Sequence, residues 1–233
     1  IVAVVVAAIW QVWLNWNMVV QTVTALQWQR VVLSFLAILP GIFFSVMSWI
    51  VFVDDLGQPI GVGRGAQISL VGSLGKYLPG SIWAYVLQIE LGRQAGLSRT
   101  RVFAATVFNL AVVVVAALLA GSLAVLPLMD QHEELSWLPW LYGILPIAVV
   151  MLHPKILTAL ANFGFRILRR PKPHHPIRIT TVTKSLGFAL LAYFCYGVHL
   201  WFLADTWQGL TVSPLALCIG TMALAMIAGL VAF

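Results

Sequence analysis

Long apolar segments follow one another along this chain, and their lengths predict helices that cross a membrane. The hydrocarbon core of a bilayer is about 30 Å thick, and a helix needs about 20 consecutive apolar residues to cross it. The segments that reach or approach this length are Ile1–Val20, Val31–Val53, Val102–Leu128, Leu138–Leu152, Leu186–Ala204 and Pro214–Phe233. The pattern therefore predicts an all-α protein, a polytopic helix bundle embedded in the membrane.

Finer features modify this pattern. The segment Leu138–Leu152 is short and contains Pro139 and Pro146, so we expect it to bend or to lie tilted. Tryptophans near the segment ends predict anchoring at the level of the lipid headgroups. They are Trp28, Trp49, Trp137, Trp140, Trp201 and Trp207. Small residues four apart predict close packing between helices. The pairs are Ala117/Gly121 and Ala216/Gly220.

Composition supports the membrane class. Of 233 residues, 61% are hydrophobic and 9% are charged, whereas soluble domains are about a quarter charged. Because the sequence begins and ends inside apolar segments, we expect residues 1–233 to be a single membrane domain cut from a longer protein at both ends. Cys195 and Cys218 lie in apolar segments without ligand-spaced His or carboxylates, so we interpret them as small buried hydrophobes.

The region 61–92 breaks the pattern. Two apolar arms, Ala66–Leu74 and Ser81–Leu91, are each about half as long as a membrane helix, and Gly and Pro residues lie at their junction. Two half-helices joined in this way form either a re-entrant hairpin or one discontinuous crossing. The glycine-rich run Gly61–Gly65 lacks the Lys-Ser/Thr ending of a phosphate loop, and we interpret it as a flexible lead-in.

The junction contains a candidate binding site for an anionic lipid headgroup. Backbone groups freed by a helix break are tolerated in a membrane only where they are buried in protein or line a cavity. If Ser81 caps the second arm, its free N–H groups and the positive end of its dipole would attract an anion, and Lys76 would add a full charge. The alternative is that Lys76 extends to an interface and the Pro-Gly pair only closes a turn. The candidate headgroup-binding residues are Lys76, Tyr77, Pro79, Gly80, Ser81 and Trp83.

The segment 153–184 is basic and has no Asp or Glu, which predicts a cytoplasmic loop by the positive-inside rule. Its first part, Lys155–Arg170, has the pattern of an amphipathic helix lying on the inner leaflet. This loop either only sets the topology or also binds lipid headgroups. If region 61–92 is re-entrant, Asp54 and Asp55 lie on the cytoplasmic side; if it crosses, they lie outside.

Other polar residues in or near the apolar segments are candidates for a polar relay, and each has a simpler structural interpretation. Glu90 and Arg93 are three apart and can pair with each other. Asn109 can form a hydrogen bond between helices, and His199 can bond to a backbone carbonyl. Asp205 is six residues from His199, so the two are not on one helix face.

The sequence contains no motif for catalysis, a metal ion or a cofactor. Nucleic-acid binding is a poor explanation of the net charge of +6, because the excess lies in one membrane-facing loop. The partners that remain are membrane lipids, with a second copy of the chain or a partner enzyme as further candidates.

The quoted motifs resemble a known family. Ser73–Trp83, followed by Gly92–Ser98, resembles the transmembrane region of the lysylphosphatidylglycerol synthase family, also called flippase-like. Gly197–Trp201 and the His153-Pro154 turn resemble its bacterial members. The resemblance implies a fold in which two re-entrant elements meet, each with a Pro-Gly signature, and it favours the re-entrant hairpin here. Many members have Glu-Arg in the span after the first signature, where this chain has Val107-Phe108-Asn109.

The resemblance also implies a function. Members of the family move a lipid, or a lipid-linked sugar or amino acid, between leaflets of the bacterial plasma membrane. Some are linked to polyprenyl-phosphate glycosylation in the cell envelope, and others are fused to a soluble aminoacyl-transferase domain. We therefore expect a flippase-like translocator for an anionic lipid or lipid-linked substrate. The alternatives are the membrane part of a transferase whose catalysis lies in another domain, and a scaffold for a partner enzyme.

Overall fold

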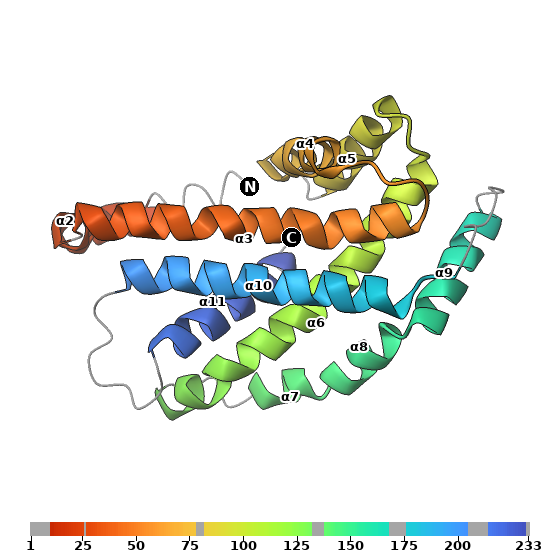
Figure 1. Cartoon of the computed structure of the whole chain (residues 1–233). Helices are drawn as coiled ribbons and strands as arrows, with labels where there is room; N and C mark the ends of the chain where they lie inside the picture. The colour runs from red at the N-terminus through yellow and green to blue at the C-terminus, as the bar shows by residue number, and fades with distance from the viewer. Residues whose placement is uncertain are drawn as a thin grey trace.

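The computed structural model describes residues 10–25, 27–77, 82–131, 138–167, 176–204 and 214–231, and in these ranges the protein contains helices and no strand (Figure 1). The predicted all-α fold is thereby confirmed. The helices are α2 (Trp16–Ala25), α3 (Trp28–Asp55), α4 (Val62–Ser73), the 3₁₀ helix η1 (Leu74–Tyr77), α5 (Ile82–Gln94), α6 (Arg99–Gln131), α7 (Leu138–Tyr142), α8 (Leu145–Met151), α9 (Pro154–Ile167), α10 (Ile179–Leu203) and α11 (Pro214–Val231).

Among the described residues, three helices are long and apolar enough to cross a membrane. They are α3, the Arg99–Val125 part of α6, and α10. The segment Leu138–Leu152, which we expected to bend or to lie tilted, is interrupted: α7 ends at Tyr142, and α8 begins at Leu145. Pro146 lies in the first turn of α8, where its missing N–H costs nothing, and so it starts a helix instead of bending one. The axes of α8 and α9 differ by 66°, and the two together pass the length test for a span.

Two predicted boundaries also move. Helix α10 begins at Ile179, seven residues before Leu186, because its polar residues Thr181 and Ser185 are buried in the bundle and not in a loop. The predicted segment Ile1–Val20 is also extended, because α2 continues past Val20 to Ala25. Residues 1–9 of that segment lie outside the described ranges.

The antiparallel pair of α3 and α10 forms the centre of the bundle (Figure 1). At one end, Ser34 Oγ lies 2.6 Å from His199 Nδ1. Toward the other end, Ser48 Oγ lies 2.9 Å from Ser185 Oγ. Between these two contacts Gly41 lies against Cys195 and the ring of Tyr196, where a Cβ would come within 2.6 Å of the ring. Each polar contact of this kind contributes about 0.6 kcal/mol in a membrane protein, so their main effect is to fix the register of the two helices.

Glycines let α11 approach its neighbours closely, as the sequence predicted for Gly121 and Gly220. A Cβ on Gly220 would lie 2.5 Å from Ala124 Cβ on α6, and one on Gly121 would lie 2.9 Å from Leu224 on α11. On α10, a Cβ on Gly197 would lie 2.6 Å from the backbone Cα of Ile219. The free cysteines fit the same packing, since Cys218 is buried and Cys195 is half-buried.

Two expectations for surface features change. Trp28 and Trp140 are 70% and 83% exposed, as an interfacial anchor requires, but Trp49 is 2% exposed and bonds inside the bundle. Trp49 is therefore a core residue and not an anchor. Helix α9 is amphipathic: Leu157 and Ala161 are buried, whereas Phe163 is exposed. The rest of the predicted amphipathic helix, 168–170, lies outside the described residues.

The close approach at Gly197 gives a test of the packing. We predict that Gly197→Ala destabilises the purified protein by about 1–3 kcal/mol, because the added methyl meets backbone that cannot move aside. The matched control is Gly187→Ala in the same helix, where a Cβ has no neighbour within 4 Å. It should be neutral or stabilising by up to about 1 kcal/mol. Thermal unfolding in detergent measures both, and equal effects would contradict the packing.

Candidate functional site

Helices α4 and α5 form an antiparallel hairpin whose two arms touch at glycines. A Cβ on Gly72 would lie 3.0 Å from the Cα of Gln88, and one on Gly75 would lie 2.6 Å from the Cα and N of Ala84. No side chain larger than hydrogen fits at Gly75 unless backbone moves. In Figure 1 α4 is seen nearly end-on beside the C-terminal half of α3, so this arm of the hairpin lies across the long helices.

The glycine-rich run before the hairpin is not a flexible lead-in, as the sequence suggested. Helix α4 begins at Val62, so most of the run forms its first turn. Gly61 has φ +76°, a left-handed conformation that favours glycine, and it turns the chain into the helix. A Cβ on Gly65 would lie 2.5 Å from Ile50 Cδ1, so Gly65 lets α4 approach α3.

A chain of polar side chains attaches the hairpin to the bundle. Trp49 Nε1 on α3 donates to Thr106 Oγ1 on α6 across 3.1 Å. The Thr106 hydroxyl lies 3.0 Å from Gln88 Oε1 on α5 and 2.8 Å from the Val102 carbonyl, and it can donate its one proton to either. Gln88 is also the residue that Gly72 contacts, so a single position on α5 meets both α4 and the bundle.

The hairpin begins and ends at the same end of the bundle. Arg101, near the start of α6, donates from Nε and Nη2 to the Val53 carbonyl at the end of α3, across 2.8 and 2.6 Å. Its Nη2 also donates to the Gln58 carbonyl. A Cβ on Gly57 would lie 2.7 Å from this guanidinium, so Gly57 leaves room for it. The chain therefore leaves α3 and enters α6 at nearly the same place.

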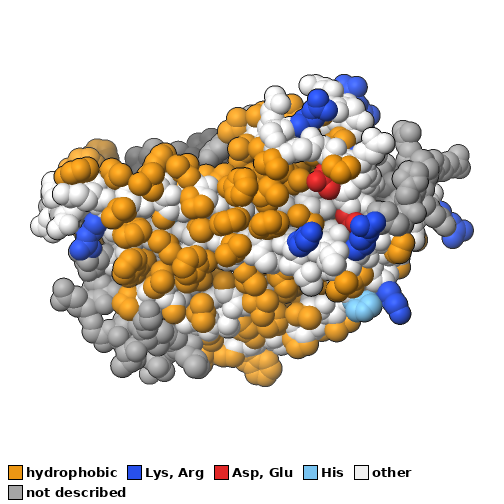
Figure 2. All heavy atoms as spheres, in the orientation of Figure 1, with side chains coloured by type: hydrophobic (Ala, Val, Ile, Leu, Met, Phe, Trp, Pro, Cys, Tyr) orange, Lys and Arg blue, Asp and Glu red, His pale blue; other side chains and the backbone are white. Residues whose placement is uncertain are grey.

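The start of α10 lies at this end as well. The Arg178 backbone N–H donates to Asp55 Oδ2 across 3.2 Å, and Arg178 Nε lies 3.9 Å from Asp55 Oδ1. Nearby, Asp54 Oδ1 accepts from the Ile60 N–H across 3.0 Å. We call the end that carries Asp55, Arg101 and Arg178 the charged end. Figure 2 shows charged side chains gathered there and over the hairpin, with hydrophobic side chains covering the long helices.

Of the predicted headgroup residues, the structure describes the backbone of Lys76 and Tyr77, and Trp83. Lys76 and Tyr77 are in η1, which continues from α4, and α5 begins at Ile82. Their side chains, and the whole of Pro79, Gly80 and Ser81, lie outside the described structure.

Trp83, in the first turn of α5, is described and is 48% exposed. After Ser73 the chain continues as the 3₁₀ helix of residues 74–77 and not as α-helix.

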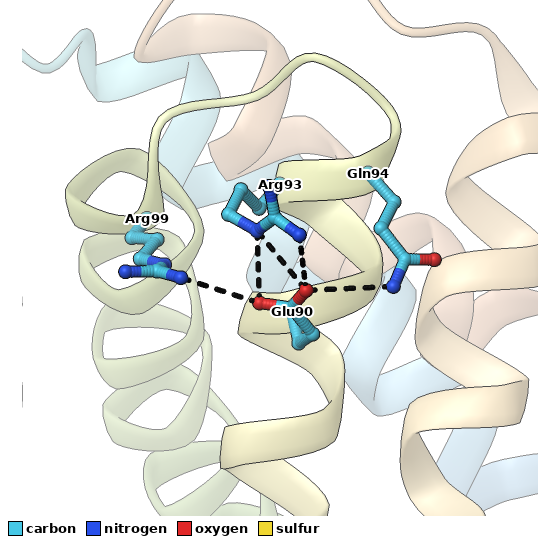
Figure 3. A network of polar contacts seen from close by, with 4 residues as sticks. All are labelled: Glu90, Arg93, Gln94 and Arg99. Atoms are coloured by element: carbon cyan, nitrogen blue, oxygen red, sulfur yellow. Dashed lines mark hydrogen bonds and ion pairs between the residues drawn. The ribbon is translucent and has the colours of Figure 1, made fainter.

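Glu90 forms a surface network at the opposite end of α5 (Figure 3). Arg93 Nε lies 3.0 and 2.9 Å from the two carboxylate oxygens, and its Nη2 lies 2.5 Å from Oε1. Arg99 Nη2 lies 3.5 Å away, and Gln94 Nε2 donates across 3.4 Å. The hydrogen bond from Arg93, which outweighs desolvation, lowers the pKa of Glu90 to about 2, so the carboxylate is ionised at physiological pH.

The other relay candidates lie at separate places. Asn109 Oδ1 accepts from Ser48 Oγ across 2.8 Å, the bond between helices that the sequence predicted. His199 Nδ1 lies 3.1 Å from the Ser34 carbonyl, the kind of partner expected for it. Asp205 lies outside the described residues. Within the described ranges, no hydrogen bond joins the Glu90 network to Asn109 or His199.

Sequence reasoning missed the residues that hold the hairpin in place. Gln88, Thr106 and Arg101 are far apart in the chain and show no motif. The only available signal is their chemistry: a polar or charged side chain inside an apolar helix needs a partner.

The contact at Gly75 predicts a selective effect on the hairpin. In Gly75→Ala, the methyl would push η1 from α5, so amide exchange should rise in 62–94 and stay unchanged in α3. The control Gly63→Ala, with no neighbour within 4 Å, should change little. Hydrogen exchange with mass spectrometry measures this, and unchanged exchange in Gly75→Ala would contradict the close approach.

With this geometry in place, the chain was compared with known proteins. Residues 1–233 match the family described as the lysylphosphatidylglycerol synthase TM region. The comparisons with curated proteins and with solved structures give no match. This match confirms the resemblance that the Lys-Tyr-Leu-Pro-Gly motif indicated. The family implies a membrane-embedded function that is related to lipids. This chain belongs to the lysylphosphatidylglycerol synthase TM region family.

Proposed function

We propose that this protein is a flippase-like translocator for an anionic lipid or a lipid-linked sugar or amino acid. The observation that carries the proposal is a helical hairpin that starts and returns at the charged end, with a break at its tip next to Lys76. Family membership supports a membrane-embedded, lipid-related role.

The proposal treats residues 61–92 as a re-entrant hairpin. The contacts of Arg101 with Val53 and of Arg178 with Asp55 support this choice, because they bring the ends of α3, α6 and α10 together. A discontinuous crossing would instead need α3 to end on the face opposite the start of α6. The re-entrant alternative also requires Asp54 and Asp55 to lie on the side of the basic loop.

The tip would act by holding a phosphate or carboxylate. Helix α5 begins at Ile82, and the first N–H groups of a helix have no partner within it. Such groups bind anions, and broken helices in transporters present them near the middle of the membrane. In this proposal Lys76 neutralises the headgroup, while Tyr77, Gly80 and Ser81 surround it and the tails stay in the bilayer.

The orientation follows from charge. The charged end and α9, with Lys155 and Arg166, would face the cytoplasm of a bacterial cell. The exposed ring of Phe163 would insert into the inner leaflet. Each nearby Lys or Arg would add about 1 kcal/mol of electrostatic attraction to an anionic membrane surface. The basic loop 153–184 would then serve as the topology signal.

The family match also favours a second candidate function. The description of the family names a synthase, so the chain could be the membrane part of a transferase that acts on lipid-linked substrates. Catalysis would then lie in a separate soluble domain. The full-length reading frame separates the two candidates: a transferase domain supports the second, and a protein without one supports translocation alone.

Removing the cation at the tip tests the translocator. We predict that Lys76→Ala lowers the rate of translocation of a fluorescent phosphatidylglycerol in proteoliposomes by about tenfold, the effect of losing about 1.4 kcal/mol of binding to the transition state. The matched control is Lys184→Ala, which removes an exposed charge from α10. Dithionite quenching of the outer-leaflet probe gives the rate. If Lys76→Ala moves the lipid as fast as the unmodified protein, the proposal is wrong.

A further inference from the structure

The two arms of the hairpin separate at its base and leave a cleft of about 340 Å³. The cleft is lined by Arg64, Gln67, Ile68, Leu91, Gln94 and Ala95. It lies on the same seam between α4 and α5 as the glycine contacts, but at the end away from Lys76. Gly65 does not bring α4 close to α5 at this end, because it contacts Ile50 on α3 instead.

The lining has the chemistry of an anion site. Arg64, Gln67 and Gln94 are exposed, whereas Ile68 is 3% exposed and belongs to the core. The side chains of Arg64 and Gln67 have no hydrogen-bond or ion-pair partner among the described residues. A guanidinium presents paired donors that match a phosphate, and each amide adds N–H donors.

The nearby carboxylate does not oppose an anion. Glu90 is bonded to Arg93 and lies 3.5 Å from Arg99, so its charge is compensated. Glu90 also accepts one N–H of Gln94, which holds that amide and leaves its second N–H for a ligand (Figure 3). Among the residues that the structure describes, Arg64 therefore remains a cation without a counter-charge at the cleft.

We propose that this cleft binds a phosphate-bearing headgroup of net negative charge, as a second site distinct from the tip of the hairpin. Its volume is at the small end of the range for ligand sites, about 300–1,000 Å³, which suits a headgroup and not acyl chains. The base of the hairpin lies near the charged end, so a headgroup would be captured at the membrane surface. This inference concerns binding and does not depend on translocation.

The test measures binding at equilibrium. The full chain with Lys76→Ala, which removes the cation of the tip site, is placed in phosphatidylcholine nanodiscs and titrated with dihexanoyl phosphatidylglycerol. We expect Arg64→Gln to weaken binding about tenfold and Arg64→Lys to weaken it less, because the ammonium keeps the charge but not the paired donors. The matched control Lys184→Gln should bind as the parent does. Calorimetry gives the dissociation constants.

A second titration with glycerol phosphate identifies the source of the phosphate. Binding of both compounds, lost in Arg64→Gln, supports a site that also accepts a soluble phosphate; binding of the lipid alone supports a headgroup site. The inference is wrong if Arg64→Gln binds like the parent, if Lys184→Gln loses as much, or if dihexanoyl phosphatidylcholine binds equally well. Every protein in this titration carries Lys76→Ala, so loss of binding at the cleft would not contradict the proposed translocation. Likewise, a negative translocation test would not contradict binding at the cleft.

Discussion

The hydrogen bonds from Arg101 to the end of α3 determine where the hairpin can go. The last carbonyls of a helix have no partner within it, so side chains, later backbone N–H groups or water must satisfy them. Here the Phe52 carbonyl accepts from the Leu56 N–H, the Asp54 carbonyl from the Gly57 N–H, and the Val53 carbonyl from Arg101. The side chain that bonds the end of α3 belongs to α6, so the two helix ends cannot separate without breaking both of its hydrogen bonds to the Val53 carbonyl. The intervening residues must return to where they began.

The rest of the hairpin uses this constraint. Arms of 12 and 13 residues are about half as long as α3, so neither is long enough to cross a membrane alone. The two short arms are held in place by their packing against each other at Gly72 and Gly75. The hydrogen bond between Gln88 and Thr106 attaches them to the bundle. Glycine contacts close the seam near the tip, whereas the cleft lies between the arms at the base. The two candidate anion sites therefore differ in origin: one is at a break in the helix, and the other is a cleft between two arms.

Features that depend on residues close together in the sequence could be predicted, whereas contacts between distant residues could not. Segment lengths predict the all-α fold and the long helices, and the Gly and Pro residues near Lys76 predict the break between α4 and α5. The bonds of Asn109 and the Glu90–Arg93 pair are predictable because polar groups in apolar helices need partners. Hydropathy fails where polar residues are buried, as at Ser185, which made α10 look shorter. The position of Trp49 near a segment end also misled the prediction of an interfacial anchor. A tryptophan there can donate its N–H to a residue inside the bundle, as Trp49 does to Thr106, and not only to the headgroup region. The contact of Arg101 with Val53 joins residues 48 positions apart and leaves no local pattern.

The most direct test of this account is which face of the membrane each end of the hairpin occupies. In a background with Cys195→Ala and Cys218→Ala, single cysteines replace Gln58, Ser98 and Lys155, and intact vesicles of known orientation are treated with a membrane-impermeant maleimide. Labelling of all three positions from one face is the result expected for a hairpin that returns to its starting point. Labelling of positions 58 and 98 from opposite faces would contradict it.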